Sequence, residues 1–164
     1  MTTILFLCHG NICRSPMAEM IFRELVGRSG LDDRFCAVSA AVSTEETGND
    51  IYPPAKRILR QKGIPFGLHR AHLVTKAEME SAALVIIMDE QNRRRLHYLF
   101  GNKFDAKTHL LMEYAGEKRS VADPWYTDDF EQAYRDIDTG CRGLLGSLTD
   151  AEWRKPSEMQ SSSL

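Results

Sequence analysis

The chain has 164 residues, of which 43% are hydrophobic and 27% charged, a balance ordinary for one globular domain with a substantial core. A formal net charge of -2 argues against a nucleic-acid-binding protein, which usually carries a strongly basic face. Nothing at the start resembles a signal peptide, and the longest apolar run, residues 82–88, is too short for a membrane span. The four cysteines lack the paired spacing of a metal site. We therefore expect a monomer of the reducing cytoplasm, without a metal or other cofactor.

The first predicted elements are a strand, a loop and a helix. Residues 4–7 form an apolar run of strand length, and residues 16–26 repeat apolar side chains at helical spacing. Ser15 and Pro16 predict the helix start, as an N-cap followed by a first helical residue whose missing N–H costs nothing. The loop of residues 8–14 should therefore connect the carboxyl end of a strand to the amino end of a helix.

The rest of the chain alternates strands and helices. Strands are expected at residues 35–40, at 84–88, where the signal is clearest, and more weakly at 109–112. Helices are expected to begin at the prolines 53–54, at the capping-box pattern 75–78, at Asp89 and at the aspartates 128–129. Such alternation implies right-handed crossovers and a parallel sheet covered by helices on both faces. Residues 1–150 are expected to form one domain, and residues 151–164, which lack periodicity, a flexible tail.

The loop of residues 8–14, which we call the phosphate loop, has the composition of an anion site. It begins with Cys8 and ends with Arg14, and Gly10 and Asn11 inside it tolerate positive φ. Such a loop can turn its backbone N–H groups inward at a helix N-terminus, and the arginine adds a planar fork for two phosphate-type oxygens. Surroundings this electropositive favour the thiolate of Cys8, which is the reactive form. Cysteine and arginine at this spacing are common by chance, so the prediction depends on the strand before the loop and the helix after it.

Two motifs together resemble a known family. The run Cys-His-Gly-Asn-Ile-Cys-Arg-Ser-Pro-Met-Ala-Glu starting at Cys8, with Asp-Pro-Trp-Tyr starting at Asp123, is similar to the low-molecular-weight protein tyrosine phosphatases over nearly the whole chain. The resemblance implies a flavodoxin-like fold with a four-stranded parallel sheet. It also implies hydrolysis of phosphotyrosine and aryl phosphate monoesters through a phosphocysteine on Cys8, with Asp123 as general acid and base. Without the family, Asp-Pro is only a turn signal.

Further site residues follow from the loop and from the resemblance. Arg14 is expected to be catalytic, together with Cys8 and Asp123. Residues expected to bind phosphate or the substrate are His9, Gly10, Asn11, Ile12, Cys13, Ser15, Glu45, Trp125 and Tyr126. Ser15 is expected to hydrogen-bond the Cys8 thiolate, and Cys13 to capture an oxidised Cys8 as a disulfide. The resemblance implies that Ser39, His69 and Asp89 brace the loop together with Asn11, and it places His72 where many relatives have arginine.

Three positions bear on the choice of substrate. Trp125 and Tyr126 could clamp a phenyl ring by stacking. Ile12 stands where relatives that resemble protein arginine phosphatases have threonine, whose hydroxyl can aid attack on phosphoarginine. Glu45 takes a position that is often aromatic in the family, so it should weaken ring stacking and favour phosphotyrosines flanked by basic residues. We expect tyrosine over serine, threonine and arginine, in phosphoprotein substrates that by family analogy include a bacterial tyrosine kinase.

Other functions on the same framework remain open. An arsenate reductase shares the loop and the fold but needs further cysteines to pass a disulfide outward. Residues 88–92 contain none, and Cys36 and Cys141 fall elsewhere. A non-catalytic phosphate-binding module would be expected to have lost Cys8 or Asp123, and both are present. A protein arginine phosphatase is the third alternative.

Overall fold

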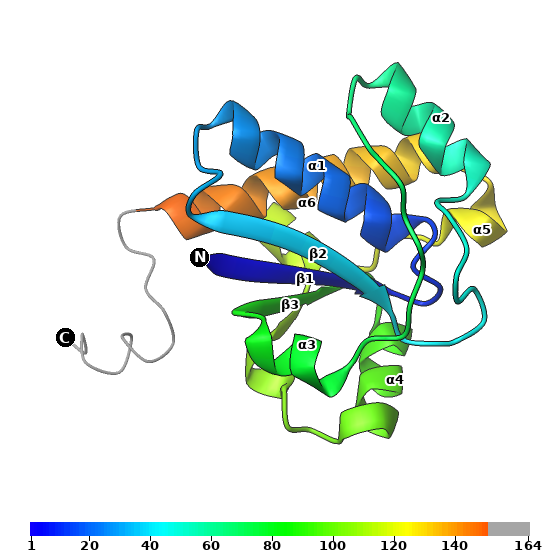
Figure 1. Cartoon of the computed structure of the whole chain (residues 1–164), viewed down its shortest axis with the longest axis vertical. Coiled ribbons are helices and arrows are strands. Elements are labelled where there is room, and N and C mark those ends of the chain that lie inside the picture. Colours follow the sequence, from blue (N-terminus) through cyan, green and yellow to red (C-terminus); the bar gives the residue numbers. More distant parts are fainter. Residues whose placement is uncertain (151–164) are drawn as a thin grey trace.

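The computed structural model describes residues 1–150, in which strands and helices alternate around a parallel sheet (Figure 1). The strands are β1 (Thr2–Cys8), β2 (Phe35–Ala41), β3 (Leu84–Ile87) and β4 (Thr108–Leu110). The α-helices are α1 (Arg14–Arg28), α2 (Pro53–Gln61), α3 (Lys76–Ser81), α4 (Glu90–Phe100), α5 (Pro124–Thr127) and α6 (Phe130–Thr149), and the short 3-10 helices η1 (Asp105–Lys107) and η2 (Leu111–Ala115) flank β4. The expected tail, residues 151–164, lies outside the described residues.

The four strands form one parallel sheet in the order β2-β1-β3-β4, which confirms the predicted fold class. Strand β1 pairs with β2 from Thr2 opposite Phe35, and with β3 from Ile4 opposite Leu84. From β1 the chain first adds β2 on one side and later β3 and β4 on the other, so the strand order reverses at β1. In open sheets of this kind ligands bind beyond the carboxyl ends of the strands at the point of reversal. The phosphate loop leaves β1 at that point.

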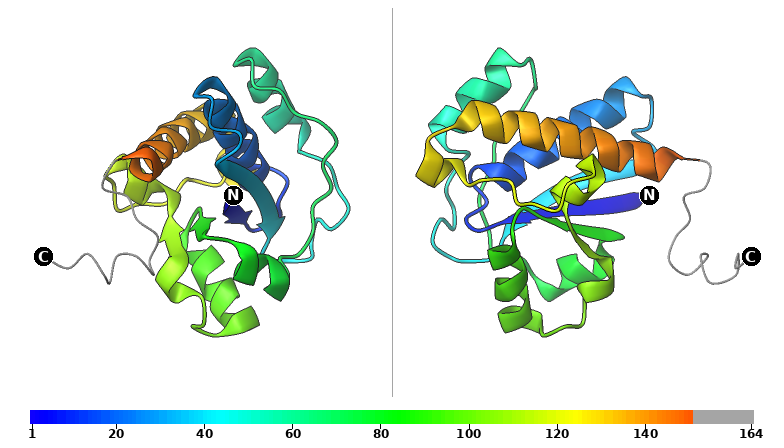
Figure 2. Two further views of the ribbon diagram at one scale, coloured as in Figure 1. Left: turned by 60° about the vertical axis from the view of Figure 1, so that its left-hand side comes forward. Right: turned by 180° about the vertical axis from the view of Figure 1, so that it is seen from behind.

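Helices cover both faces of the sheet (Figure 2). Helices α1 and α6 pack against one face, and α3 and α4 lie on the other. Neighbouring side chains of β1 point to opposite faces, so Ile4 and Phe6 join the core beneath α1 and α6, whereas Leu5 and Leu7 join the core beneath α3 and α4. All four are fully buried. Burial on both faces explains why β1 reads as an uninterrupted apolar run.

Helix α6 lies unusually close to η2 because two glycines of α6 face η2. A Cβ atom on Gly143 would lie 1.9 Å from the backbone oxygen of Tyr114, and one on Gly140 would lie 2.6 Å from Leu111 Cγ. No side chain fits in either space. This contact fixes η2 on α6 and, with it, the start of the segment that leads to Asp123.

Several expected boundaries are correct and others differ. Thr75 and Glu78 form the predicted capping box at the start of α3. Helix α4 starts after Asp89 as expected, and the structure adds a capping box there between Asp89 and Asn92. Helix α1, however, begins at Arg14, and its N-cap residue Cys13 makes no side-chain capping bond. The prediction of Ser15 as N-cap is therefore wrong.

The differences nearer the end of the chain involve short elements. The strand expected at residues 109–112 is β4, and the chain turns into η2 directly after Leu110. Helix α5 was not expected, and Asp123 caps it by accepting a hydrogen bond from the backbone of Trp125. Asp129 caps α6 as expected, whereas Asp128 takes a left-handed conformation at the end of α5.

Candidate active site

The phosphate loop surrounds the sulfur of Cys8 with hydrogen-bond donors. Cys8 is the last residue of β1, and Asn11 turns the loop with a positive φ of 60°. The backbone N–H of Asn11 donates to Cys8 Sγ at 3.3 Å, and Ser15 Oγ lies 3.0 Å from the same sulfur. Both groups can donate a hydrogen bond to the sulfur, so the loop places two donors at the Cys8 side chain.

A buried chain of polar side chains supports this arrangement from behind. The side-chain amide of Asn11 donates to Ser15 Oγ at 2.8 Å and to Ser39 Oγ at 3.0 Å. Ser39 in turn donates its hydroxyl hydrogen to Glu19 Oε1 at 2.6 Å. Since Ser15 accepts from Asn11, its own hydrogen remains available for Cys8. Glu19 was missed by the sequence reasoning, although a carboxylate within the apolar stripe of a helix is a signal that could have indicated it.

The two histidines singled out earlier lie in different places. His69 Nε2 lies 2.7 Å from the backbone oxygen of Asn11. A carbonyl oxygen can only accept, so Nε2 must carry a hydrogen and His69 clamps the turn of the loop. His72 pairs instead with Glu78 at 2.8 Å on α3, away from the loop.

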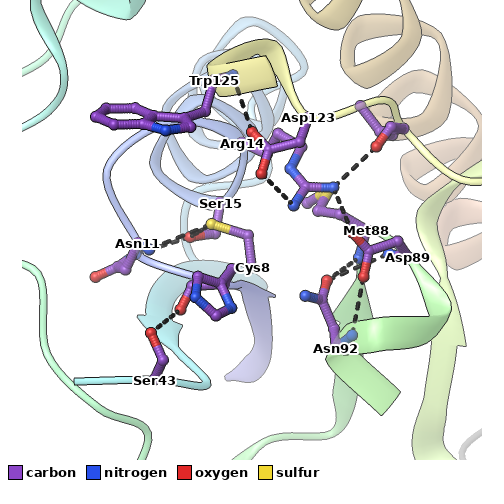
Figure 3. A network of polar contacts seen from close by, with 12 residues as sticks. Cys8, Asn11, Arg14, Ser15, Ser43, Met88, Asp89, Asn92, Asp123 and Trp125 are labelled. Atoms are coloured by element: carbon purple, nitrogen blue, oxygen red, sulfur yellow. Dashed lines mark hydrogen bonds and ion pairs between the residues drawn. The ribbon is translucent and has the colours of Figure 1, made fainter. Parts of the chain in front are cut away.

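Arg14 is the electrostatic centre of the site (Figure 3). It is 2% exposed, and its guanidinium donates to Asp89 Oδ2 and to the backbone oxygen of Val121, both at 2.8 Å, and to Asp123 Oδ2 at 3.3 Å. Burial opposes the charge of Arg14, but the negative charges of Cys8, Asp123 and Asp89 outweigh it and raise the pKa. The arginine is therefore a permanent cation whose plane is fixed beside the Cys8 sulfur.

Asp123 is positioned above the loop by three elements. Its Oδ1 accepts the backbone N–H of Trp125 at 3.0 Å, and its Oδ2 faces Arg14. Two residues earlier, the backbone N–H of Val121 donates to the Met88 oxygen at 2.9 Å, which joins the segment to the end of β3. Val121 carried no signal in the sequence because only its backbone is used.

One pocket collects most of the expected residues. Its lining consists of Cys8, His9, Gly10, Ile12, Cys13, Arg14, Glu45, Glu46, Asp123, Trp125 and Tyr126. Asn11, Ser15, Ser39, His69 and Asp89 lie behind this lining and contact it through the hydrogen bonds described above. Trp125 and Tyr126 are exposed at the mouth, and Trp125 packs on Tyr52 with ring centroids 4.9 Å apart. Sequence reasoning missed Glu46 and Tyr52.

The two glutamates at the mouth differ in their partners. Glu45 Oε2 lies 2.9 Å from His9 Nε2, so its carboxylate contacts a side chain of the phosphate loop. Glu46 packs over the loop, where a Cβ on Gly10 would lie 3.0 Å from its Cγ, and it accepts a hydrogen bond from Asn49. Within residues 1–150 no cationic side chain forms an ion pair with Glu46. The mouth therefore presents an acidic edge.

Cys13, inside the phosphate loop, forms no disulfide within the described residues. Cys13 is 5% exposed, and burial, followed by the nearby charges of Cys8 and Asp123, raises the pKa of its thiol. Cys13 is thus a neutral thiol beside the loop sulfur.

In the described part of the chain no three His, Cys, Asp or Glu side chains are grouped to hold a metal ion. None of the helices described is both long and apolar enough to cross a membrane.

Comparison with known proteins agrees with this geometry. A family model for low molecular weight phosphotyrosine protein phosphatase matches residues 3–154. The Bacillus subtilis low molecular weight protein-tyrosine-phosphatase YfkJ is 37% identical over 150 residues, covering 90% of this chain and 96% of that protein. Its crystal structure superposes with a TM-score of 0.89 over 93% of this chain and 98% of that one, at 36% identity.

Two further relatives widen the comparison. The low molecular weight phosphotyrosine protein phosphatase of Sus scrofa is 38% identical over 149 residues, covering 87% of this chain and 93% of that protein. The arginine phosphatase YwlE of Bacillus subtilis has a structure 32% identical, with a TM-score of 0.81 over 92% of this chain and 98% of that one. The chain therefore belongs to the low molecular weight phosphotyrosine protein phosphatase family.

Proposed function

We propose that this protein is a protein-tyrosine phosphatase that hydrolyses phosphotyrosine and aryl phosphate monoesters through a phosphocysteine on Cys8. The observation that carries the proposal is the position of the Cys8 sulfur. It lies 3.3 Å from the Asn11 N–H and 3.0 Å from Ser15 Oγ, in a pocket that Arg14 and Asp123 also line. A nucleophile, an anion-binding cation and an acid group therefore converge on one space.

In the first step the phosphate dianion binds to the loop N–H groups and to Arg14. The thiolate of Cys8 attacks phosphorus, the S–P bond forms, and the bond to the tyrosine oxygen breaks. Asp123, as the neutral acid, transfers its proton to that leaving oxygen. Protonation matters because an unassisted phenolate of an ordinary tyrosine, with a pKa of about 10, is a poor leaving group.

In the second step water replaces the sulfur. Asp123 is now a carboxylate and removes a proton from the attacking water, while the S–P bond breaks and its electron pair returns to Cys8. Ser15 donates its hydroxyl hydrogen to the sulfur and stabilises the departing thiolate. The network through Asn11, Ser39 and Glu19 keeps that hydrogen directed at Cys8.

The walls of the pocket support an aryl phosphate as substrate. Trp125 and Tyr126 stand at the mouth beside Asp123, and Ile12 adds an apolar surface. A phenyl ring can stack between such walls, whereas serine and threonine phosphates are too short to reach them. Glu45 and Glu46 at the rim favour phosphotyrosines with basic neighbours in the protein substrate.

Four measurements test the proposal. Cys8→Ser should abolish turnover of phosphotyrosine and retain binding of inorganic phosphate, and a chelator should leave the wild-type rate unchanged. The ratio of kcat/KM for phosphotyrosine and phosphoarginine peptides separates the two specificities found among the relatives. A preference for phosphoarginine would overturn the tyrosine assignment. A kcat/KM for thiol-dependent arsenate reduction above that for phosphotyrosine hydrolysis would indicate the reductase instead.

A further inference from the structure

Asp123 stands at the end of a segment, residues 116–123, that we call the acid loop. The acid loop connects η2 to α5 and contains no helix or strand. Val121 holds it at one point, because its N–H donates to Met88 at 2.9 Å and its carbonyl oxygen accepts from Arg14 at 2.8 Å. Asp123, two residues further on, is itself bonded to Arg14 and to the Trp125 N–H, so this end of the acid loop forms one attachment. A second attachment between η2 and Val121 fixes the direction from which the chain enters that end.

The second attachment is a bidentate ion pair between the acid loop and α6. The two terminal nitrogens of Arg119 donate to the two carboxylate oxygens of Asp136 at 2.8 and 3.0 Å. Asp136 is only 5% exposed, although it is an acidic residue on the side of a helix. Gln132, one turn earlier on α6, donates to the same carboxylate at 2.9 Å.

This pair differs from the other ion pairs on the surface of α6. A bidentate contact fixes both the distance and the plane of the guanidinium, whereas an ordinary surface pair fixes neither. The hydrogen bonds from Arg119 lower the pKa of Asp136, so the carboxylate stays charged and needs its partner. Helix α6 is itself seated on η2 through Gly143, so the carboxylate belongs to a rigid support.

We propose that Arg119 and Asp136 are positioning residues for the proton transfer: their ion pair orients the acid loop so that Asp123 remains over the Cys8 sulfur. The inference rests on the proposed role of Asp123 as general acid. Arg119 touches neither phosphate nor the reacting atoms in this arrangement. It acts by restricting the loop that begins at η2 and ends at Asp123.

The test is the dependence of kcat/KM on the leaving group. For a series of aryl phosphates, kcat/KM reports the steps up to departure of the phenol. A well-placed acid makes log kcat/KM nearly independent of the pKa of that phenol, and a misplaced acid makes the plot steep. We expect Arg119→Met to lose about tenfold on phenyl phosphate and less than about twofold on dinitrophenyl phosphate, within the range that general acid catalysis supplies. Arg119→Lys retains one hydrogen bond to Asp136, so its loss of kcat/KM on phenyl phosphate should lie between those of Arg119→Met and wild type.

Matched variants separate the possible outcomes. Arg142→Met removes another arginine–aspartate pair of α6, in which Arg142 donates to the carboxylate oxygens of Asp138 at 3.0 and 3.1 Å. Neither residue bonds to the acid loop, so this variant should leave the slope of log kcat/KM against the pKa of the phenol unchanged. Asp123→Asn should steepen the slope, and adding Arg119→Met to it should steepen it no further.

Each contrary result has one meaning. An equal loss on every substrate in both Arg119→Met and Arg119→Lys would reduce the pair to a structural role and overturn the inference. A steep slope in Asp123→Asn with an unchanged slope in both Arg119 variants would do the same while leaving the proposed function intact. An unchanged slope in Asp123→Asn would instead overturn the role of Asp123 on which the proposed function depends.

Discussion

Replacing Asn11 with alanine should destabilise the protein by an amount that the structure sets. The amide donates to Ser15 at 2.8 Å and to Ser39 at 3.0 Å, and each buried bond contributes about 1–1.5 kcal/mol. Alanine must also keep the positive φ of 60°, which costs about 1 kcal/mol. Within residues 1–150 Asn11 Oδ1 is buried without a hydrogen-bond partner, so its removal relieves about 1 kcal/mol. The net loss should be roughly 2–3 kcal/mol.

Urea unfolding measures this loss as a lower midpoint at an unchanged slope. Ser43→Ala is the matched control, because it removes one hydroxyl bond to the His9 carbonyl at 2.9 Å without touching a residue of positive φ. That variant should lose about 1 kcal/mol. Turnover should also fall in Asn11→Ala, because Ser15 loses the donor that directs its hydrogen to Cys8. A loss in Asn11→Ala no larger than in Ser43→Ala would refute the reasoning.

Three further outcomes are expected. After peroxide treatment, thiol should restore activity to wild type and much less to Cys13→Ser, because Cys13 can trap the sulfenic acid of Cys8 as a disulfide; equal recovery would make Cys13 a packing residue. Glu45→Trp should lower KM for small aryl phosphates by about two- to tenfold through stacking, and an unchanged KM would remove Glu45 from the binding surface. Because Arg119 lowers the pKa of Asp136, the pair's contribution to stability should be complete above a pH of about 4 and disappear as the pH falls through the lowered folded value. Urea midpoints should therefore fall less on acidification in Arg119→Met than in wild type.

Much of the fold could be predicted because its signals are local. The apolar run of β1, the capping box at Thr75 and the helix start at Asp89 involve neighbouring residues, and all three were predicted correctly. The same local reading fails for α5, since a helix of 4 residues has no periodicity to detect. Ser15 was misread for a related reason. Ser-Pro at a helix start is equally compatible with a cap and with a side chain facing inward, and only the position of Cys8 decides between them.

The parts of the site that depend on neighbouring side chains of distinctive chemistry could be predicted. The parts that depend on backbone atoms, or on residues brought together only by the fold, could not. Cys8 and Arg14 share one short loop, so their proximity follows from the turn. To the site Val121 contributes only its backbone N–H and carbonyl oxygen, which every residue except proline supplies. Arg119 and Asp136 lie 17 positions apart on a loop and a helix, and a lone arginine and a lone aspartate read as ordinary surface charges until the fold brings them together.

The order of the elements along the chain has a consequence for synthesis. The phosphate loop is synthesised more than 100 residues before the start of α6 (Phe130–Thr149), the helix that packs across α1. Until α6 emerges, α1 can pack only on the sheet, the part of it that faces α6 has no cover, and the contact between the Cys141 thiol and the Ala18 carbonyl at 3.7 Å cannot form. Contacts between residues this far apart in the sequence form slowly, and a domain completes its folding as one unit. A nascent chain that contains Cys8 and Arg14 but stops short of residue 123 therefore lacks both Asp123 and the helix that supports its loop, and catalytic competence has to wait until α6 has been synthesised.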